Sequence, residues 1–299
     1  MKVLVTGAHG TVGTAVTEHL DPAVADRVAD RPNPPEPCAT QEYEFVLLDR
    51  EEPPAGHPHR DYPGRVVTAD VTDRDAIAPA FEGVDAVVHL AGYPRTDGTW
   101  PEVRSNNVEG THAVLEAASD ADVERFVFAS SNHVVGMYEV EHRPEIYGEF
   151  DLLVDHTSKI RPDSEYGASK AAGEAFLSKF AESEGWRGYA LRIGSVRDPP
   201  YDHPYGDAER GVDDGRWERG SDAYEEQVAR LQCTWQSRRD VAHVVDRCLR
   251  DEAVTFEVFY GVSDNDRRWF DIGHAREVID YDPRDSAEAW DDVPAWSGY

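Results

Sequence analysis

Lysine is scarce in this sequence. Only four of its 30 basic residues are lysine, and the 30 stand against 59 acidic residues, which gives a formal net charge of −29. A surface with this charge repels nucleic acid and anionic lipid, so we expect neither as a partner. Acid-rich, lysine-poor proteins are typical of salt-loving organisms, where dissolved ions screen charges within a few Å. The composition therefore predicts a halophilic protein, with an acidic protein of an ordinary cytosol as the alternative.

Cysteines and long apolar stretches are also lacking. The three cysteines, Cys38, Cys233 and Cys248, are an odd number without C-x-x-C spacing, which indicates neither a disulfide framework nor a zinc site. We therefore expect no metal. No stretch approaches the roughly 18 apolar residues of a membrane span, and the opening "MKVLVTG" has no signal-type apolar run. The sequence predicts a cytoplasmic protein without a membrane partner.

Short apolar runs rich in β-branched residues recur along the chain, with helical segments between them. Their near-continuous hydrophobicity is typical of strands that are buried on both faces of a parallel sheet. The sequence therefore predicts an α/β fold, a Rossmann-type doubly wound parallel sheet with a small C-terminal substrate-binding region. The six expected strands are 2–6, 44–49, 65–70, 85–91, 125–130 and 188–193.

Two stretches interrupt this alternation. Residues 29–43 carry four prolines, which predicts a surface loop before the second strand. Residues 197–229 are rich in Asp, Gly, Tyr and Arg, and we expect a long loop there, placed as a lid over a site.

A glycine-rich turn follows the first expected strand. In "TGAHGTVG", Gly7, Gly10 and Gly13 lie at the mouth of the expected helix "TVGTAVTEHL". Glycines at this place allow a tight turn and let backbone N–H groups approach a pyrophosphate at the helix N-terminus. Because the turn lies between a strand and a helix, it predicts a dinucleotide site rather than a plain turn.

Acidic residues lie at the ends of the next two strands. Asp49 can accept hydrogen bonds from both hydroxyls of an adenosine ribose and would repel a 2′-phosphate, which favours NAD. Arg50 could instead pair with that phosphate, so NADP stays open. Asp70 and Val71 lie where adenine is expected, and a helix cap is the alternative for Asp70.

Tyr166 and Lys170 lie four residues apart in "SEYGASK", which places them on one face of an expected helix. A free tyrosine is a poor base at neutral pH because its pKa is about 10. We expect the lysine ammonium to stabilise the phenolate and to lower the pKa of the phenol, so that Tyr166 can accept and return a proton. A solvated helical pair is the alternative.

Polar residues end the fifth expected strand. "RFVFASSNHVVG" delivers Ser130, Ser131, Asn132 and His133 to the carboxyl edge of the sheet, where doubly wound sheets bind ligands. A serine hydroxyl there can donate a hydrogen bond to the substrate oxygen that Tyr166 deprotonates. Histidine in such a position is more often a packed side chain than a catalytic one.

These motifs together resemble the extended short-chain dehydrogenase/reductase family. "TGAHGTVG", "HLAG" at 89–92, "NNVEGT" at 106–111 and "YGASK" carry the resemblance, which covers nearly the whole chain. It implies a catalytic triad of Ser131, Tyr166 and Lys170. The cofactor contacts that it implies, together with those above, are Gly7, Gly10, Thr11, Val12, Gly13, Asp49, Arg50, Asp70, Val71, Leu90, Ala91, Gly92, Asn107, Tyr166, Lys170 and Ile193.

The same resemblance implies one domain over residues 1–299. Residues 1–195 would be mainly the Rossmann core that binds NAD or NADP, and residues 196–237 and 255–299 would be cap elements that bind substrate. Enzymes of this kind also lead us to expect a homo-oligomer, either a dimer or a tetramer.

A closer similarity is to the uronate dehydrogenases and related sugar 1-dehydrogenases, including aldose and glucose-6-phosphate enzymes of haloarchaea. "SSNHVVG", "RPDSEYGASK", "LRIGS", "CTWQS" and "FYGVSDNDRRWFD" carry it. It implies that Ser131, Asn132, His133 and Tyr166 contact a sugar. It also implies that Arg230, three residues before "CTW", binds a carboxylate of the substrate.

Two departures weaken the uronate assignment. Tyr93 and Pro94 follow "HLAG", where uronate enzymes tend to present a small hydroxyl residue, and the segment before Arg230 is longer. We therefore expect a rebuilt substrate wall that includes Tyr93. For a neutral sugar, Arg230 would hydrogen-bond ring hydroxyls or pair with an acid of 197–229.

The sequence as a whole predicts an enzyme that oxidises a sugar at C1 to the lactone with NAD or NADP. Tyr166 would accept the hydroxyl proton while hydride passes from C1 to the nicotinamide. The departures favour a neutral aldose such as L-arabinose, with a uronate or glucose 6-phosphate as alternatives. The rival functions are a nucleotide-sugar epimerase or dehydratase and a non-catalytic NAD-binding protein.

Overall fold

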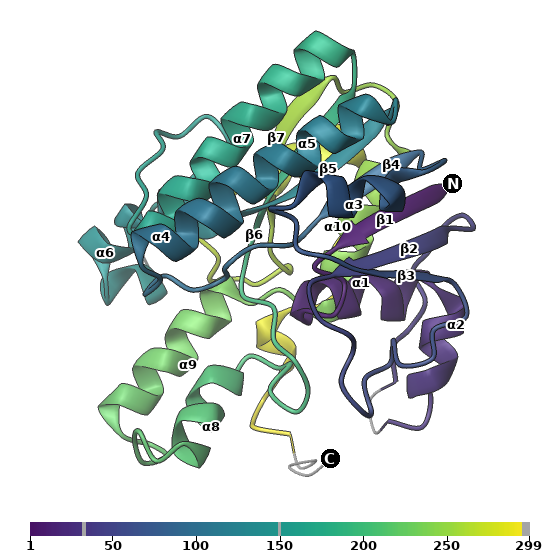
Figure 1. Cartoon of the computed structure of the whole chain (residues 1–299). Helices are drawn as coiled ribbons and strands as arrows, with labels where there is room; N and C mark the ends of the chain where they lie inside the picture. Colours follow the sequence, from purple (N-terminus) through teal and green to yellow (C-terminus); the bar gives the residue numbers. More distant parts are fainter. Residues whose placement is uncertain (32–33, 149–150, 295–299) are drawn as a thin grey trace.

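Seven parallel strands form the centre of the protein (Figure 1). The computed structural model describes residues 1–31, 34–148 and 151–294. The strand order is β3-β2-β1-β4-β5-β6-β7, and every neighbouring pair is parallel, which confirms the predicted fold class. All six expected strands are present, and β7 adds an unexpected one beside β6. The strands are β1 (Lys2–Thr6), β2 (Glu44–Asp49), β3 (Arg65–Thr68), β4 (Ala86–His89), β5 (Arg125–Ser131), β6 (Arg187–Ile193) and β7 (Phe256–Gly261).

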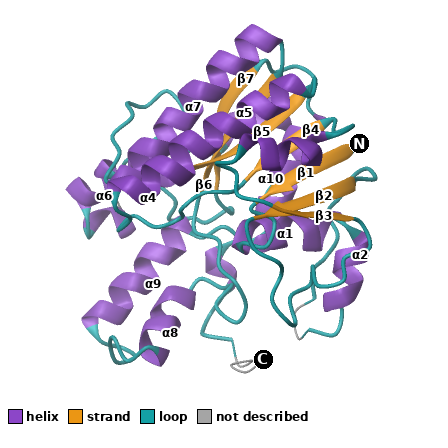
Figure 2. Cartoon of the chain, viewed as in Figure 1, coloured by secondary structure: helices purple, strands orange, loops and turns teal. Residues whose placement is uncertain are grey.

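Helices cover both faces of this sheet (Figure 2). Side chains alternate between the two faces along a strand, so Val3 and Val5 of β1 join one core with α1 and α10, and Leu4 joins a second core with α5 and α7. No helix among the described residues is long and apolar enough to cross a membrane. The α-helices are α1 (Thr11–Leu20), α2 (Pro22–Ala25), α3 (Arg74–Ile77), α4 (Trp100–Val103), α5 (Gly110–Asp120), α6 (Met137–His142), α7 (Glu165–Glu184), α8 (Gly206–Asp213), α9 (Asp222–Thr234), α10 (Arg238–Arg250) and α11 (Gly273–Ile279).

Shorter turns of helix connect these elements. One, η3 (Arg104–Glu109), is a π-helix that runs into α5. The others are 3₁₀-helices, namely η1 (Asp26–Val28), η2 (Ala78–Phe81), η4 (Asn132–Val135), η5 (Glu145–Tyr147) and η6 (Ala287–Ala289).

The carboxyl ends of all seven strands share one edge of the sheet because the strands are parallel. The strand order reverses between β1 and β4, since the chain runs outward from β1 to β3 and then returns to the other side of β1. Loops that leave in opposite directions at such a reversal open a crevice, which is where doubly wound sheets bind ligands. The glycine turn, Asp49 and Ser131 all follow or end strands at this edge.

The described part of segment 29–43 contains neither helix nor strand, as predicted; Pro32 and Asn33 lie outside the described residues. The loop predicted for 197–229 is wrong, because α8 and the first part of α9 occupy much of it. Ala208, Tyr224 and Val228 pack together in a small hydrophobic core of this segment. The two helices form a lobe beside the carboxyl edge of the sheet (Figure 1).

Candidate active site

The turn after β1 packs too tightly for side chains. Gly7 has a φ of +66°, and a Cβ atom on it would lie 2.7 Å from the backbone nitrogen of Ala91. A Cβ atom on Gly13 would lie 2.5 Å from the carbonyl oxygen of Ala8. Gly10 is the N-cap of α1 and offers no side-chain capping bond, so the first N–H groups of the helix stay available to an anion. The turn therefore fits a pyrophosphate.

A cleft that we name the glycine-turn cleft runs from this turn to the ends of β2 and β3. At its far wall Asp49 accepts a hydrogen bond from the N–H of His9 at 2.9 Å, and Arg50 lies exposed, 3.7 Å from Glu51. A carboxylate at the end of β2, beside a helix N-terminus, fits an adenosine ribose with free hydroxyls. The expected cofactor residues that line the cleft are Gly7, Gly10, Thr11, Val12, Gly13, Asp49, Arg50, Asp70, Val71, Leu90, Ala91 and Gly92.

Asp70 makes a local turn at the end of β3. Its carboxylate accepts hydrogen bonds from the N–H and the hydroxyl of Thr72, at 2.9 and 2.8 Å, and these bonds lower its pKa. The helix-cap alternative for Asp70 is wrong, because Asp73 caps α3 by accepting the N–H of Ala76. Asp70 thus shapes the wall of the glycine-turn cleft.

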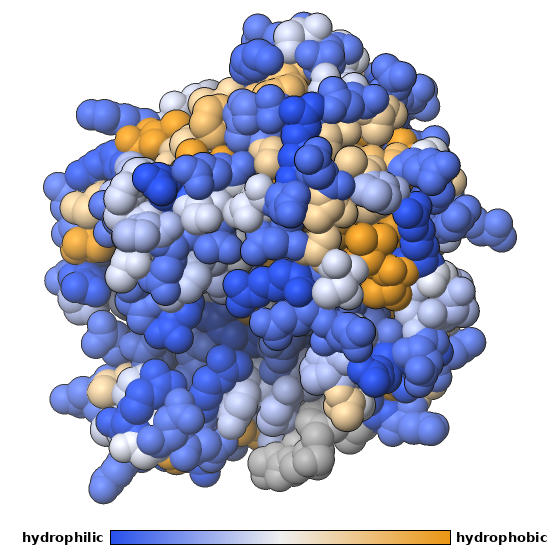
Figure 3. All heavy atoms as spheres, viewed as in Figure 1, coloured by the Kyte–Doolittle hydropathy of each residue, from blue (hydrophilic) through white to orange (hydrophobic). Residues whose placement is uncertain are grey.

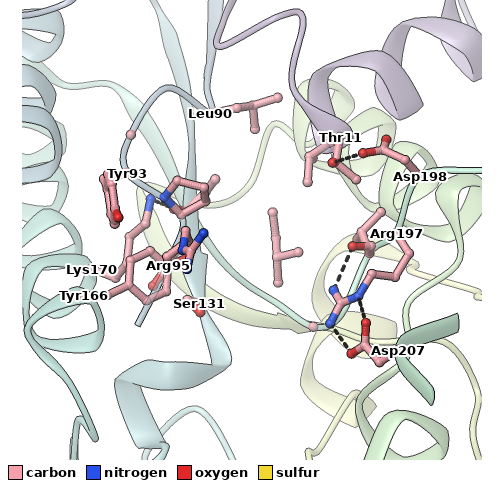
Figure 4. Close-up of a pocket in the computed structure, with 18 of the residues that line it drawn as sticks. Thr11, Leu90, Tyr93, Arg95, Ser131, Tyr166, Lys170, Arg197, Asp198 and Asp207 are labelled. Atoms are coloured by element: carbon pink, nitrogen blue, oxygen red, sulfur yellow. Dashed lines mark hydrogen bonds and ion pairs between the residues drawn. The ribbon is translucent and has the colours of Figure 1, made fainter. Parts of the chain in front are cut away.

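Tyr166, Lys170 and Ser131 line a second cleft, the tyrosine cleft, which adjoins the first through Thr11 and Leu90 (Figure 4). Ser164 caps α7 by accepting the N–H of Gly167 with its hydroxyl, so Tyr166 lies in the first helical turn. Figure 4 shows these side chains on one side of the cleft and Arg197 and Asp207 on the other. Tyr93 and Ile193 also line it, as expected.

Hydrogen bonds orient the three groups. The Ser131 hydroxyl accepts the N–H of His133 at 3.2 Å and lies near enough to the phenol of Tyr166 to lower the pKa of that phenol. Lys170 is buried, and its Nζ donates to the carbonyl oxygen of Ala129 at 2.7 Å and lies 5.8 Å from the centroid of the Tyr166 ring. The structure therefore brings the predicted triad together at the carboxyl end of β5.

The pKa of Tyr166 differs from the expected one. Burial raises the pKa of Tyr166, the nearby Ser131 hydroxyl lowers it, and the charge of Asp163 raises it, with a net rise. Burial also lowers the pKa of Lys170, to about 8. The expected fall in the pKa of the phenol is therefore wrong for the protein without ligands, because the cost of burying a phenolate outweighs the favourable contacts.

Asn107 positions the loop after β4. Its side chain accepts the N–H of Tyr93 at 2.6 Å and donates to the carbonyl oxygen of Tyr93 at 3.1 Å and to Ser169 at 3.0 Å. Among the described residues that line the glycine-turn cleft and the tyrosine cleft, Asn106 is present and Asn107 is not. We therefore assign Asn107 a supporting contact rather than the expected cofactor contact.

A third cleft, the arginine cleft, shares Ser131 and Tyr166 with the tyrosine cleft. The expected sugar contacts Asn132, His133 and Arg230 line it. His133 Nδ1 lies 2.7 Å from a carboxylate oxygen of Asp163, and its ring meets the ring of Tyr166 edge-on, with centroids 5.8 Å apart. Burial opposes ionisation of Asp163, but its hydrogen bond and charge interaction with His133 hold its pKa below its ordinary value. Tyr93 lines the tyrosine cleft instead.

Arg230 has a buried partner. Its guanidinium donates to both carboxylate oxygens of Glu139 in α6, at 2.5 and 3.3 Å, and the hydroxyl of Tyr147 donates to Glu139 at 2.7 Å. Burial opposes ionisation of Glu139, yet these two contacts hold its pKa below the ordinary value. The direct partner of Arg230 is therefore Glu139 rather than an acid of 197–229, and within that segment Asp207 acts on Arg230 only through its charge.

Sequence reasoning missed most of the basic residues near Tyr166. Arg95, Arg197, Arg216 and Arg230 line the arginine cleft, and among its described lining residues only Asp97 is acidic. Each of these arginines pairs with a carboxylate, namely Asp97, Asp207, Asp214 and Glu139 in the same order, so the cleft is rich in arginine while its charges are balanced. Figure 3 shows the hollow between the α8–α9 lobe and the sheet, with a hydrophilic surface.

The family model for the NAD dependent epimerase/dehydratase family matches residues 3–248. The chain belongs to this family. It is 36% identical over 287 residues to the NAD-dependent glucose-6-phosphate dehydrogenase of Haloferax volcanii, with 95% of this chain and 94% of that protein covered. It is also 32% identical over 293 residues to the L-arabinose 1-dehydrogenase (NAD(P)(+)) of the same organism, with 96% and 97% covered.

A solved structure of a uronate dehydrogenase shows the same fold. The uronate dehydrogenase of Agrobacterium tumefaciens has a TM-score of 0.66 and 25% sequence identity, with 96% of this chain and 86% of that chain covered. The relatives thus include the two groups of sugar enzymes that the sequence motifs resemble. The predicted family is confirmed.

Proposed function

We propose that the protein oxidises a monosaccharide at C1 to the lactone, with NAD⁺ as the oxidant. The observation that supports this best is that Tyr166, Ser131 and Lys170 line the tyrosine cleft, which shares lining residues with the glycine-turn cleft and with the arginine cleft. The glycine-turn cleft fits a dinucleotide, and the arginine cleft offers polar and charged groups to a small polar molecule. A cofactor in the first cleft and a substrate in the second would then both lie close to the phenol of Tyr166.

The chemistry assigns each residue a separate task. NAD⁺, when bound, supplies the acceptor for the hydride that leaves C1. Tyr166, as phenolate, takes the proton of the C1 hydroxyl while the C1–O bond becomes a carbonyl. Ser131 donates a hydrogen bond to the same oxygen, and Lys170 places a cation near the phenolate, which favours its formation. The products are the lactone, NADH and one proton.

Asp49 supports NAD rather than NADP. A carboxylate at this position would repel a 2′-phosphate, and Arg50 is exposed and lies near Glu51, a second acid that lines the cleft. Of the two relatives from Haloferax volcanii, the glucose-6-phosphate dehydrogenase is named as NAD-dependent, and the name of the L-arabinose 1-dehydrogenase includes both NAD and NADP. We therefore propose NAD as the preferred cofactor, with weaker use of NADP.

The arginine cleft supports a sugar that carries an anionic group. Arg95 and Arg216 pair with Asp97 and Asp214, but both arginine side chains are at least half exposed, so these surface pairs can exchange for a phosphate or a carboxylate of the substrate. The relative with 36% identity is a glucose-6-phosphate dehydrogenase. We therefore propose a sugar phosphate as the first substrate class and place the neutral aldose second.

One contact favours that second candidate. Glu139 already neutralises Arg230, so the residue that the sequence linked to a uronate carboxylate needs no anion from the substrate. This supports a neutral aldose such as L-arabinose and weakens the uronate.

Residues 196–237 supply Arg197, Arg216 and Arg230 to the arginine cleft, so we propose this segment as the substrate cap. Part of the second expected cap segment, 255–299, belongs to the sheet instead, because it contains β7.

A substrate panel tests the proposal. NADH formation would be measured in molar KCl with glucose 6-phosphate, glucose, glucuronate, galacturonate and L-arabinose, with Tyr166→Phe as the inactive control. We expect glucose 6-phosphate to give a higher kcat/KM than glucose. Turnover of a nucleotide sugar without net NADH would instead support the epimerase or dehydratase function.

A further inference from the structure

Three histidines with no part in the proposed reaction meet beside the glycine turn. His9 lies in the turn itself, and His57 and His59 lie in the connection from β2 to β3. One nitrogen from each ring can be chosen so that all three lie within 4.8 Å of one another. The chain thus folds three imidazoles from two distant segments into one cluster.

The rings are arranged around a common centre. Their centroids are 5.4 Å apart for His9 and His57, 5.1 Å for His9 and His59, and 4.8 Å for His57 and His59, with planes inclined by 61°, 56° and 66°. Three imidazoles on one tetrahedral metal ion, with metal–nitrogen bonds of about 2.0–2.1 Å, have centroids about 5 Å apart. The spacing and tilt of the cluster match that arrangement.

Hydrogen bonds leave a lone pair directed into the cluster. The Thr17 hydroxyl donates to a backbone carbonyl of α1, so it accepts from Nε2 of His59 at 2.7 Å. This leaves Nδ1 of His59 without a proton, 2.9 Å from Nδ1 of His9. The proton between these two atoms belongs to His9, whose Nε2 is buried and has no hydrogen-bond partner among the described residues. A metal ion can replace that proton. In His57, Nδ1 accepts the N–H of His59 at 3.1 Å, so the metal would take the place of the longer 3.3 Å contact between Nε2 and the Thr14 hydroxyl.

The cluster is neutral, and charges of both signs lie near it, with Arg27 on the side of His59 and acids on the side of His57. Burial lowers the pKa of all three imidazoles, that of His59 to about 3, with the neighbouring rings lowering it further. Neutral imidazole is the form that binds metal. Glu18 and Asp198 lie near enough to His57 to act on its charge, and Asp49 bonds the backbone of His9.

We propose that His9, His57 and His59 bind a divalent transition-metal ion such as Zn²⁺ or Co²⁺. The ion ties the β2–β3 connection to the glycine turn. Glu51, Glu52 and Pro54 of that connection line the glycine-turn cleft, so the site stiffens the wall of that cleft. The ion takes no part in the proposed oxidation, and its binding is independent of that function.

A second cluster provides the control. His156, Glu257 and His274 also bring three ligand atoms within 4.8 Å. The rings of His156 and His274, however, are stacked, with centroids 3.6 Å apart and planes inclined by only 13°. A metal bound to a histidine lies close to its ring plane, and one ion cannot lie in two parallel planes. His274→Gln should therefore leave metal binding unchanged.

Cobalt titration of the EDTA-treated full-length protein tests the site. We expect one Co²⁺ per chain, with the strong visible absorption of tetrahedral cobalt, and a rise in melting temperature. His57→Gln and His59→Gln should each weaken Co²⁺ binding by at least about tenfold, and Zn²⁺ should displace Co²⁺ from the wild type. Because His57 is only half-buried, His57→Gln keeps the fold even where His59→Gln does not.

Three results would contradict the metal site. No Co²⁺ binding to the wild type would show that the three rings are only a hydrogen-bonded neutral cluster. Unchanged affinity in a folded His57→Gln variant, or loss of binding in His274→Gln, would also overturn the proposal. Sugar oxidation needs no measurement in this experiment, so its outcome is separate from that of the proposed function.

Discussion

At the scale of the residue, Tyr166 carries the proposed reaction. Tyr166→Phe keeps the ring and removes the proton acceptor, so kcat should fall by at least about 10²-fold. Binding of NADH, followed by its fluorescence, should change little because the glycine turn is untouched. Turnover close to that of the wild type would exclude Tyr166 as the base.

The pH profile follows from the charge of the same residue. Oxidation needs the phenolate, and burial raises the pKa of Tyr166, so kcat/KM for oxidation should increase as pH rises through the alkaline range. Lactone reduction needs the phenol and should decrease. Lys170 loses its proton near a pKa of about 8, below the pH range in which the phenol ionises, so Lys170→Met should lower kcat/KM below about pH 8 and leave the alkaline rise in place. A flat or falling oxidation profile would contradict this assignment.

Asp49 tests the choice of cofactor. Asp49→Ala removes an acceptor for the ribose hydroxyls of NAD and a repulsion towards the 2′-phosphate of NADP, so KM for NAD should rise more than KM for NADP. Glu52→Ala is the matched control, since Glu52 lines the same cleft but does not end a strand. Equal changes for both cofactors would show that Asp49 is only a structural acid that holds the N–H of His9.

The site residues that could be predicted from the sequence are those that belong to local sequence patterns. Some site residues lie at the ends of elements whose apolar pattern is visible in the sequence. These are Gly7, Asp49, Ser131 and Tyr166. Because the strands are parallel, such residues come together at one edge of the sheet. The buried environment of Tyr166, which raises its pKa, depends on contacts between distant segments. The cluster of His9, His57 and His59 depends on such contacts too, and no spacing of ligands in the sequence reveals it.

At the scale of the element, one buried ion pair joins α6 to α9. Arg230→Met would leave the carboxylate of Glu139 buried without its cation, which should lower the free energy of unfolding by about 3 kcal/mol. The double variant Glu139→Met/Arg230→Met should lose less than the sum of the single changes. Urea unfolding in molar KCl measures all of them.

A neighbouring exposed pair is the matched control. Arg161 and Glu141 lie 2.7 Å apart but are partly exposed, so the same substitutions there should cost less than about 1 kcal/mol. Additive losses for Glu139 and Arg230 would mean that the pair does not couple the two helices.

The α8–α9 lobe shows why this part of the fold was not predicted. Ala208, Tyr224 and Val228 are separated by acids, glycines and arginines, so no helical apolar pattern stands out. Ion pairs such as Arg197 with Asp207, at 2.6 Å, help to hold the segment, and they link residues ten apart. The composition indicated a loop, whereas the packing of few apolar residues produced two helices.

At the scale of the whole molecule, the net charge of −29 dominates. Self-repulsion among these acids destabilises the compact state, and dissolved salt screens it. We therefore expect the melting temperature to rise with KCl from about 0.1 M to about 2 M, where the Debye length falls from about 10 Å to below about 3 Å. A melting temperature independent of KCl would favour an acidic protein of an ordinary cytosol.

The homo-oligomer expected from the sequence stays a prediction, which light scattering at the same salt concentrations can check.

The central claim is that this molecule moves a hydride from C1 of a sugar to NAD⁺ and releases the product. The most direct measurement uses the most active sugar of the panel with deuterium at C1, followed by mass spectrometry of sugar and cofactor after turnover in molar KCl. We predict that the NADH carries the deuterium, that the sugar product lacks it, and that the two form in equal amounts. Deuterium that stays on or returns to the sugar, without net NADH, would contradict the account and assign the site to an epimerase or dehydratase reaction.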